Sequence, residues 1–318
     1  FSVLVTEREI LRALGELPRE YLWLALLLGI VPWFTNALRL LIWTRFLGHG
    51  VRFREAFEIT LATDLGAAVS PTAVGGGFFK WGLLVQRGVS PGAAASLTTL
   101  TPIEDGLFFA IALPVAIFIT ASWDHPVFVR VAGEFRESAP LVILIALAIA
   151  VVSWAAVRFV LGGGLGPRTQ RRSLRVALRF RRSLRATSVD ALQVFRMIRV
   201  DGKARFALSM SLTAVQWTCR YSIISALIAF LGAPVQPVLF WLLQWVVFTL
   251  AAFIPTPGAA GGAEAAFFVI YSPFLPGTLV ALATAGWRFL TFYLLLGLAG
   301  VLYIVLGGLH RRTPNAGS

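Results

Sequence analysis

The twelve residues from Phe253 to Glu264 place two prolines, three glycines and a carboxylate between two apolar runs. Proline removes a backbone donor and glycine weakens a helix, so the sequence predicts that the chain unwinds here. Unwound backbone at membrane depth persists only where protein or a water-filled cavity satisfies its polar groups. The stretch therefore predicts a broken helix at a polar interior. We expect its hinge residues to be Pro257, Gly258, Gly261 and Gly262.

A second stretch, from Ser70 to Lys80, has the same pattern of proline, glycines and an ionisable residue. Pro71, Gly75 and Gly76 precede Pro257, Gly261 and Gly262 by 186 positions, and Gly77 completes this second set of predicted hinges. Trp33 and Trp217 are 184 apart, and Pro91 and Pro276 are 185 apart. A nearly constant offset indicates an internal repeat. We expect one half at about 20–121 and the other at about 206–308.

The composition points to a polytopic all-α membrane protein. Of 318 residues, 58% are hydrophobic and 14% charged, with a mean hydropathy of +0.79. This is far more apolar than a soluble domain. We expect residues 1–318 to form a single integral membrane domain, and the initial Phe1 leads us to expect that a preceding segment is missing. The net charge of +13 is concentrated in one loop, which favours a topology signal over nucleic-acid binding.

Apolar runs long enough to cross a bilayer alternate with shorter ones. The predicted spans are 21–46, 93–120, 140–161, 206–231 and 278–306. Half-helices are predicted at 56–69 and 78–89 around the first break, and at 238–253 and 263–271 around the second.

Charge asymmetry decides how the broken segments lie in the membrane. Between Arg158 and Arg205 the chain holds 13 Arg or Lys residues but only two Asp. Cytoplasmic loops accumulate Lys and Arg, so the loop 162–205 and the C-terminus are predicted to be cytoplasmic. A first broken segment that crossed the membrane would put this loop outside; one that dips in and returns keeps it inside. We therefore predict an inverted-topology repeat with two re-entrant broken-helix hairpins, located in the cytoplasmic (inner) membrane.

Ionisable side chains inside apolar segments are costly unless they pair or line a wet cavity, so they are the candidate substrate-binding residues. Asn36 with Arg39 is compatible with a phosphate contact or with a snorkelling arginine. Glu264 either complements a helix dipole or belongs to a site. Glu104 and Arg288 correspond by the repeat and either form a salt bridge or contact solute. The full set is Asn36, Arg39, Asp64, Lys80, Glu104, Asp105, Arg220, Glu264 and Arg288.

Enzyme signatures are scarce. The sequence has no zinc-protease, nucleophile-elbow or phosphate-loop motif. The three histidines are scattered and the one cysteine, Cys219, lies in an apolar run. We expect no catalytic residue, no metal and no cofactor.

Four motifs resemble the lysylphosphatidylglycerol synthase transmembrane region, the flippase-like half of bacterial multiple peptide resistance factors. They are 36–43 (NALRLLIW), 70–76 (SPTAVGG), 88–91 (GVSP) with Glu104 and Asp105, and 255–264 (PTPGAAGGAE) with Arg288. The resemblance implies transbilayer movement of lipids such as aminoacylated phosphatidylglycerol, glycolipids or hopanoids. It also implies no synthase activity, because the family's soluble aminoacyl-transfer domain is not in this sequence. Lys80 departs from the acidic residue of the second repeat.

Three functions remain open from the sequence. The first is a lipid translocase that moves a polar, anionic, aminoacylated or glycosylated headgroup through a cavity between the repeats. The alternatives are a secondary transporter of a small soluble solute and a membrane-embedded lipid-modifying enzyme. The expected partners are membrane lipids, a second copy of the chain and a separate lipid-synthesising enzyme, and not nucleic acid.

Overall fold

The computed structural model describes residues 18–70, 74–121, 196–198, 200–254 and 256–311, and every regular element in these ranges is a helix. Three of these helices are long and apolar enough to cross a membrane: Glu20–Phe46, Pro91–Thr120 and Gly277–Gly307. The first two match the predicted spans 21–46 and 93–120, and the third matches 278–306. The predicted span 140–161 and most of the basic loop lie outside the described residues.

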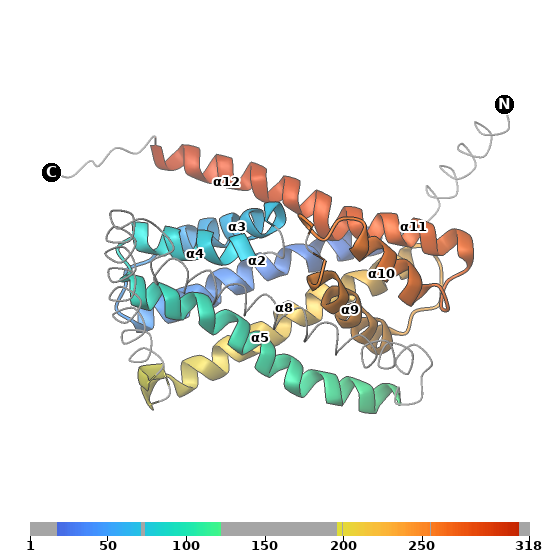
Figure 1. Ribbon diagram of the computed structural model, residues 1–318, viewed down its shortest axis with the longest axis horizontal. Helices are drawn as coiled ribbons and strands as arrows, with labels where there is room; N and C mark the ends of the chain where they lie inside the picture. The colour runs from blue at the N-terminus through green and yellow to red at the C-terminus, as the bar shows by residue number, and fades with distance from the viewer. Residues whose placement is uncertain (1–17, 71–73, 122–195, 199, 255, 312–318) are drawn as a thin grey trace, which may run out of the picture.

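Within residues 18–121, as far as they are described, the helices follow the order long, short, short, long (Figure 1). Local sequence explains their ends. The backbone N–H of Arg52 donates to the Glu55 carboxylate, which caps the second helix, and Ser90 caps the fourth, with Pro91 at its first position. The helices are α2 (Glu20–Phe46), α3 (Phe53–Val69), α4 (Val74–Gln86) and α5 (Pro91–Thr120).

The second group of helices has the same order. Its last long helix is continuous but contains one π-helical segment in its middle, η2. The elements are α8 (Lys203–Phe230), α9 (Pro237–Ala252), α10 (Gly262–Tyr271), α11 (Gly277–Arg288), η2 (Phe289–Leu294) and α12 (Leu295–Arg311).

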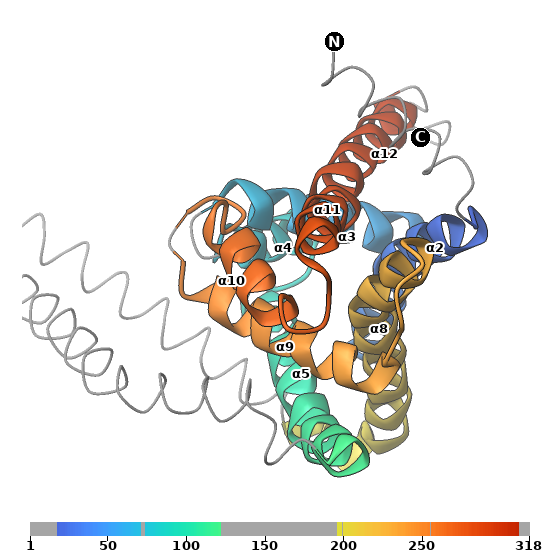
Figure 2. The same cartoon turned by 90° about the vertical axis from the view of Figure 1, so that its right-hand side faces the viewer.

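Helices α2 and α8 lie side by side and run antiparallel (Figures 1 and 2). The indole of Trp43 donates to the Ser209 hydroxyl at one end of the pair. At the other end a Cβ on Gly29 would lie 3.7 Å from the Ile223 side chain. Residue numbers thus rise on one helix while they fall on the other.

Helix α8 has the length of the predicted span 206–231 but is not among the three helices with strongly apolar composition. Its polar side chains explain the difference. Ser209, Thr213 and Gln216 are all buried inside the protein. Gln216 accepts a hydrogen bond from Arg39 of α2 and Ser209 accepts one from Trp43. The polar face of α8 is therefore turned toward other helices.

Helices α3 and α4 form a hairpin. The Arg87 guanidinium, just after α4, bonds to the Glu55 carbonyl and the Glu58 carboxylate at the start of α3. Contrary to prediction, Gly75, Gly76 and Gly77 lie in the first turns of α4 and not in unwound backbone. A Cβ on Gly75 would lie 2.6 Å from the Gly66 carbonyl oxygen, so close helix packing is the reason for glycine there. Pro71 lies outside the described residues.

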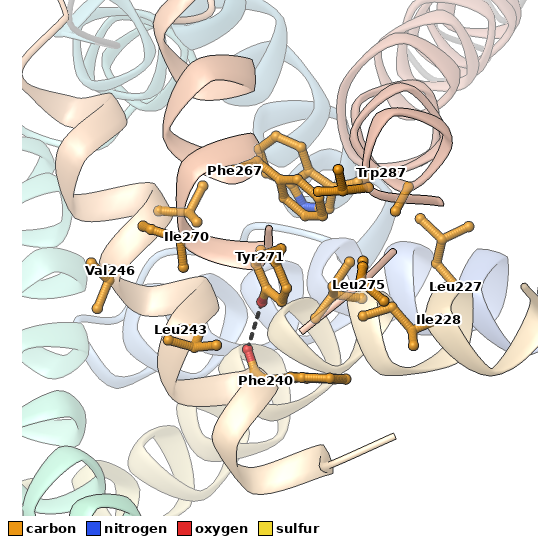
Figure 3. Close-up of a cluster of buried hydrophobic side chains, with 14 of the residues drawn as sticks. Leu227, Ile228, Phe240, Leu243, Val246, Phe267, Ile270, Tyr271, Leu275 and Trp287 are labelled. Carbon is orange, nitrogen blue, oxygen red and sulfur yellow. Dashed lines mark hydrogen bonds between the residues drawn. The ribbon is translucent and has the colours of Figure 1, made fainter. Parts of the chain in front are cut away.

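Helices α9 and α10 form the second hairpin, and a core of aromatic and aliphatic side chains joins them to α11 (Figure 3). The Tyr271 hydroxyl, at the end of α10, donates to the Phe240 carbonyl at the start of α9 at 2.9 Å. The Phe267 ring stacks on Trp287 of α11, with centroids 4.8 Å apart. The hairpin is thereby fixed to the long helix that follows it.

Candidate functional site

A cavity of about 310 Å³ lies where the ends of α3 and α9 approach each other. Ala67 and Ala68 of α3 line one side, and Ala251 and Ala252 of α9 line another. Helices α2, α8, α10, α11, η2 and α12 also contribute. The wall is mostly apolar and aromatic, with charged side chains at three positions: Asp64, Arg220 and Arg288.

The guanidinium of Arg220 forms no ion pair or hydrogen bond with any other described residue. It lies 5.8 Å from the ring centroid of Trp217 and 5.7 Å from that of Phe248. Aromatic faces attract a cation without neutralising its charge. Arg220 therefore offers its hydrogen-bond donors to whatever occupies the cavity.

Asp64 of α3 also lines the cavity, and its charge is opposite in sign to that of Arg220. Its carboxylate accepts a hydrogen bond of 2.9 Å from the indole of Trp33 on α2. This bond fixes the direction of the carboxylate but leaves acceptor capacity unused. The cavity thus contains both a positive and a negative group that a bound molecule can contact.

Arg288 has a protein partner. Its Nε lies 2.7 Å from the Oε1 of Glu264, in the first turn of α10. Its Nη2 donates to the Gly258 carbonyl in the unwound segment, and its guanidinium lies 4.2 Å from the Phe292 ring centroid. Arg288 therefore connects the break in the second hairpin to the long helix.

Comparison with known proteins shows which family this chain is similar to. The family model for the lysylphosphatidylglycerol synthase transmembrane region matches residues 2–299. The chain belongs to this family. A UPF0104 membrane protein from Archaeoglobus fulgidus is 24% identical over 271 residues, which cover 85% of this chain and 81% of the archaeal protein. The chain is accordingly a multi-pass membrane protein of the lysylphosphatidylglycerol synthase transmembrane-region family.

In this family member a second group of charged side chains lies apart from the cavity. Arg39 is 2% exposed and pairs with Glu104 at 2.7 Å and with Asp105 at 3.1 Å. Its remaining donors bond to Gln216, Asn36 and the Thr101 carbonyl. Asn36 and Arg39 do not present the expected phosphate contact, because protein acceptors surround the Arg39 guanidinium. The cluster joins α2 to α5 and α8.

Glu104 does not pair with Arg288, the partner that the sequence suggested, and Lys80 bonds to a hydroxyl. The Lys80 ammonium donates to the Thr101 hydroxyl at 2.6 Å, and Glu104 bonds to Arg39 and to the indole of Trp43. Arg288 bonds to Glu264 and not to Glu104. The candidate residues of this lysylphosphatidylglycerol synthase transmembrane-region protein thus separate into a cavity group and a buried structural group.

The unwound segment between α9 and α10 contains three residues with positive φ: Gly258, Ala259 and Gly261. A Cβ on Gly258 would lie 2.4 Å from the Phe292 ring, so this glycine is required by space as well as by backbone conformation. Gly262 begins α10, and a Cβ there would overlap the Ile254 side chain. Sequence reasoning did not single out Phe248 or Phe292, since neither aromatic carries a local signal that distinguishes it from the core.

Proposed function

We propose that this protein is a lipid translocase whose cavity takes up a headgroup with a phosphate and an amine while the acyl chains stay in the bilayer. The observation that carries the proposal is Arg220, a cation that lines the cavity and forms no ion pair or hydrogen bond with a described residue, while the Asp64 carboxylate of the same cavity attracts it only at longer range. A charged group at membrane depth is costly unless it has a function or a partner. The name of the family, which refers to lysylphosphatidylglycerol synthase, is compatible with such a headgroup.

We infer an inverted-topology repeat from the bounds and directions of the helices, and this inference supports the proposal. A shift of 184 carries Glu20–Phe46 to 204–230, against Lys203–Phe230 for α8, and carries Phe53–Val69 to 237–253, against Pro237–Ala252 for α9. Corresponding helices run in opposite directions: α2 against α8, and α5 against α11 to α12 (Figure 1). In transporters with inverted repeats, the substrate site lies near the midplane at the repeat interface. The cavity is lined by residues of both groups of helices, as expected of a site between two repeats.

The distribution of basic residues supports an orientation. Arg205, at the start of α8, lies over the Phe46 ring at the end of α2, and Arg54 of α3 bonds to the Leu306 carbonyl of α12. These residues therefore share one end of the molecule with Arg87. The described loops 231–237 and 272–277 at the other end hold no charged residue. By the positive-inside rule the basic end faces the cytoplasm.

This orientation gives the two hairpins opposite entry sides. The α3–α4 hairpin opens at the basic end, where Arg87 bonds to Glu55. The α9–α10 hairpin opens at the other end, where Tyr271 bonds to Phe240. Each helix of the two hairpins has between 10 and 17 residues, fewer than the about 20 that a span needs. We infer that both are re-entrant and that their breaks meet at the cavity.

The chemistry of the wall favours a headgroup that carries both signs of charge. The planar guanidinium of Arg220 suits bidentate contact with a phosphate. Asp64 suits an ammonium group, because its carboxylate retains acceptor capacity beyond the Trp33 bond. The apolar remainder of the wall accommodates the glycerol and the first methylenes. An aminoacylated or ethanolamine phospholipid has this combination of groups.

Reconstitution into vesicles tests the proposal. Fluorescent phospholipids with different headgroups become accessible to dithionite faster in vesicles with protein if the chain translocates lipid. We expect Arg220→Ala to slow this exchange about tenfold or more, because a charge-assisted hydrogen bond contributes about 1.5 to 3 kcal/mol. Arg205→Ala removes the same charge from the same helix outside the cavity and is the matched control. Unchanged exchange relative to empty vesicles for every headgroup overturns the proposal.

A further inference from the structure

A second hollow of about 400 Å³ lies between α2, α8 and the segment from α11 to η2. It is separate from the charged cavity, and eleven of its twelve lining residues are apolar or glycine. The lining residues are Arg19, Leu22, Trp23, Leu26, Leu227, Phe230, Leu231, Leu282, Gly286, Phe289, Leu290 and Leu294. We call this feature the apolar groove.

One end of the apolar groove has the composition of a membrane interface. Arg19 is its single charged residue, and Trp23 beside it is 70% exposed. Tryptophan and arginine concentrate at the level of lipid headgroups. The same end holds Leu231, which begins the uncharged loop after α8. The apolar groove therefore starts at the headgroup level and runs along the helices into the hydrocarbon region.

The other end of the apolar groove lies one helical turn from the charged cavity. On α2, Leu26 lines the groove and Gly29 lines the cavity; on α8, Leu227 lines the groove and Ile223 the cavity. In the long helix the two sets of lining residues alternate around η2, with Phe289, Leu290 and Leu294 on the groove and Arg288, Thr291 and Leu295 on the cavity, so this helix forms a wall shared by the two spaces. The Leu295 side chain approaches the Cβ position of Gly29 to 3.2 Å, so α2 and α12 are in contact close to where the groove ends.

We propose that the apolar groove binds one acyl chain of a membrane phospholipid, with the phosphate near Arg19 at the interface. The wall offers apolar contact along its length and a single cation at the headgroup level, which matches the distribution of polarity in a phospholipid. This inference rests on the proposed function for one point only, that the groove is the route by which a lipid reaches the cavity past Leu295. Binding itself does not require translocation.

Photo-crosslinking tests the binding. The full chain in vesicles is exposed to a phospholipid with a diazirine on its acyl chain, and labelled peptides are identified by mass spectrometry. We expect labels to concentrate at Leu227, Leu282 and Leu290. Uniform labelling of all exposed apolar faces, such as that of α12, overturns the inference. The inference is also overturned if the groove stays unlabelled because residues 1–17 or a second copy of the chain cover it.

Two substitutions that fill the groove sharpen the test. Gly286→Phe projects a ring toward Leu227, whose side chain lies 3.3 Å from the Cβ position, and Leu282→Trp fills the outer end. Gly300→Phe is the matched control, because nothing lies within 4 Å of its Cβ position. We expect groove labelling to fall at least fivefold in a filled variant that elutes as a single folded species, and to persist in the control. Unchanged labelling in both filled variants contradicts the inference.

The same preparations separate this inference from the proposed function. Groove labelling in a protein that accelerates no lipid exchange leaves the binding site standing and removes the proposed function. Rapid lipid exchange without groove labelling removes the binding site and leaves the proposed function standing. Slower exchange in the filled variants, with Arg220 intact, supports the groove as the route into the cavity.

Discussion

Arg288 and Glu264 form a 2.7 Å ion pair that fastens the start of α10 to the end of α11, beside the central cavity. The same arginine donates to the Gly258 carbonyl, so one side chain satisfies both a carboxylate and unwound backbone. In the proposed repeat, Lys80 stands where the second half has the acidic Glu264, and Glu104 stands where it has Arg288. The two groups of helices therefore carry opposite charges at matched positions, and the pair is closed in only one of them.

Removal of one partner of this pair is expected to destabilise the protein strongly. Glu264→Gln leaves the guanidinium of Arg288, which is 7% exposed, without its counter-charge. Breaking a fully buried pair costs about 3 to 5 kcal/mol, and the 28% exposure of the Glu264 side chain lowers the expected loss to about 1.5 to 3 kcal/mol. Thermal unfolding in detergent, followed by size-exclusion chromatography, measures the loss. Glu55→Gln, at a surface cap, is the control and is expected to lose about 1 kcal/mol or less.

Locking this pair is expected to stop translocation. In a transporter with inverted repeats, the opposite state exchanges the conformations of the two halves. That state would open Glu264 from Arg288 and bring Lys80 toward Glu104. With Cys219 replaced by alanine, Glu264→Cys with Arg288→Cys and a short cleavable bifunctional crosslinker should abolish lipid exchange, and cleavage should restore it. Exchange at the wild-type rate in the crosslinked protein would contradict the alternation.

Gly258 and Gly261 allow backbone strain to be separated from steric exclusion. Both have positive φ, at 62° and 83°, and Gly261 with a ψ of −48° lies outside the left-handed helical region, so alanine at either position introduces strain of about 1 to 3 kcal/mol. Only at Gly258 would the new Cβ meet the Phe292 ring, at 2.4 Å. We expect Gly258→Ala to lower thermal stability more than Gly261→Ala, and Phe292→Ala to reverse part of the difference. Equal losses in the two single variants would show that the ring contact is unimportant.

The glycines of α4 give a comparison within one helix. Gly75→Ala places a Cβ 2.6 Å from the Gly66 carbonyl and should force α3 and α4 apart, with a loss of about 1 to 3 kcal/mol. Gly82→Ala meets nothing within 4 Å and should raise stability by up to about 1 kcal/mol through helix propensity. Thermal unfolding of the two variants and of the wild type measures the expected loss of stability at Gly75 and the expected gain at Gly82. A loss at both positions would argue against hairpin packing as the cause.

The break after α9 was predictable because Pro257, Gly258 and Gly261 act on the backbone locally. The helical start of α4 was not predictable. Its glycines allow close contact with α3, and the sequence alone does not show how the turn between α3 and α4 brings the two helices together. The same limit applies to Arg39, which was expected to meet a phosphate. Its partners Glu104 and Gln216 lie 65 and 177 residues away, and no local pattern pairs them.

The polar face of α8 has a consequence for biogenesis. Ser209, Thr213 and Gln216 are covered by protein in the finished structure, but a nascent α8 that left the translocon alone would present them to lipid. Its antiparallel neighbour α2, synthesised well over a hundred residues earlier, supplies Arg39 and Trp43 as partners for two of these groups. Integration of the later part of the chain into the bilayer thus depends on the earlier part already being in place.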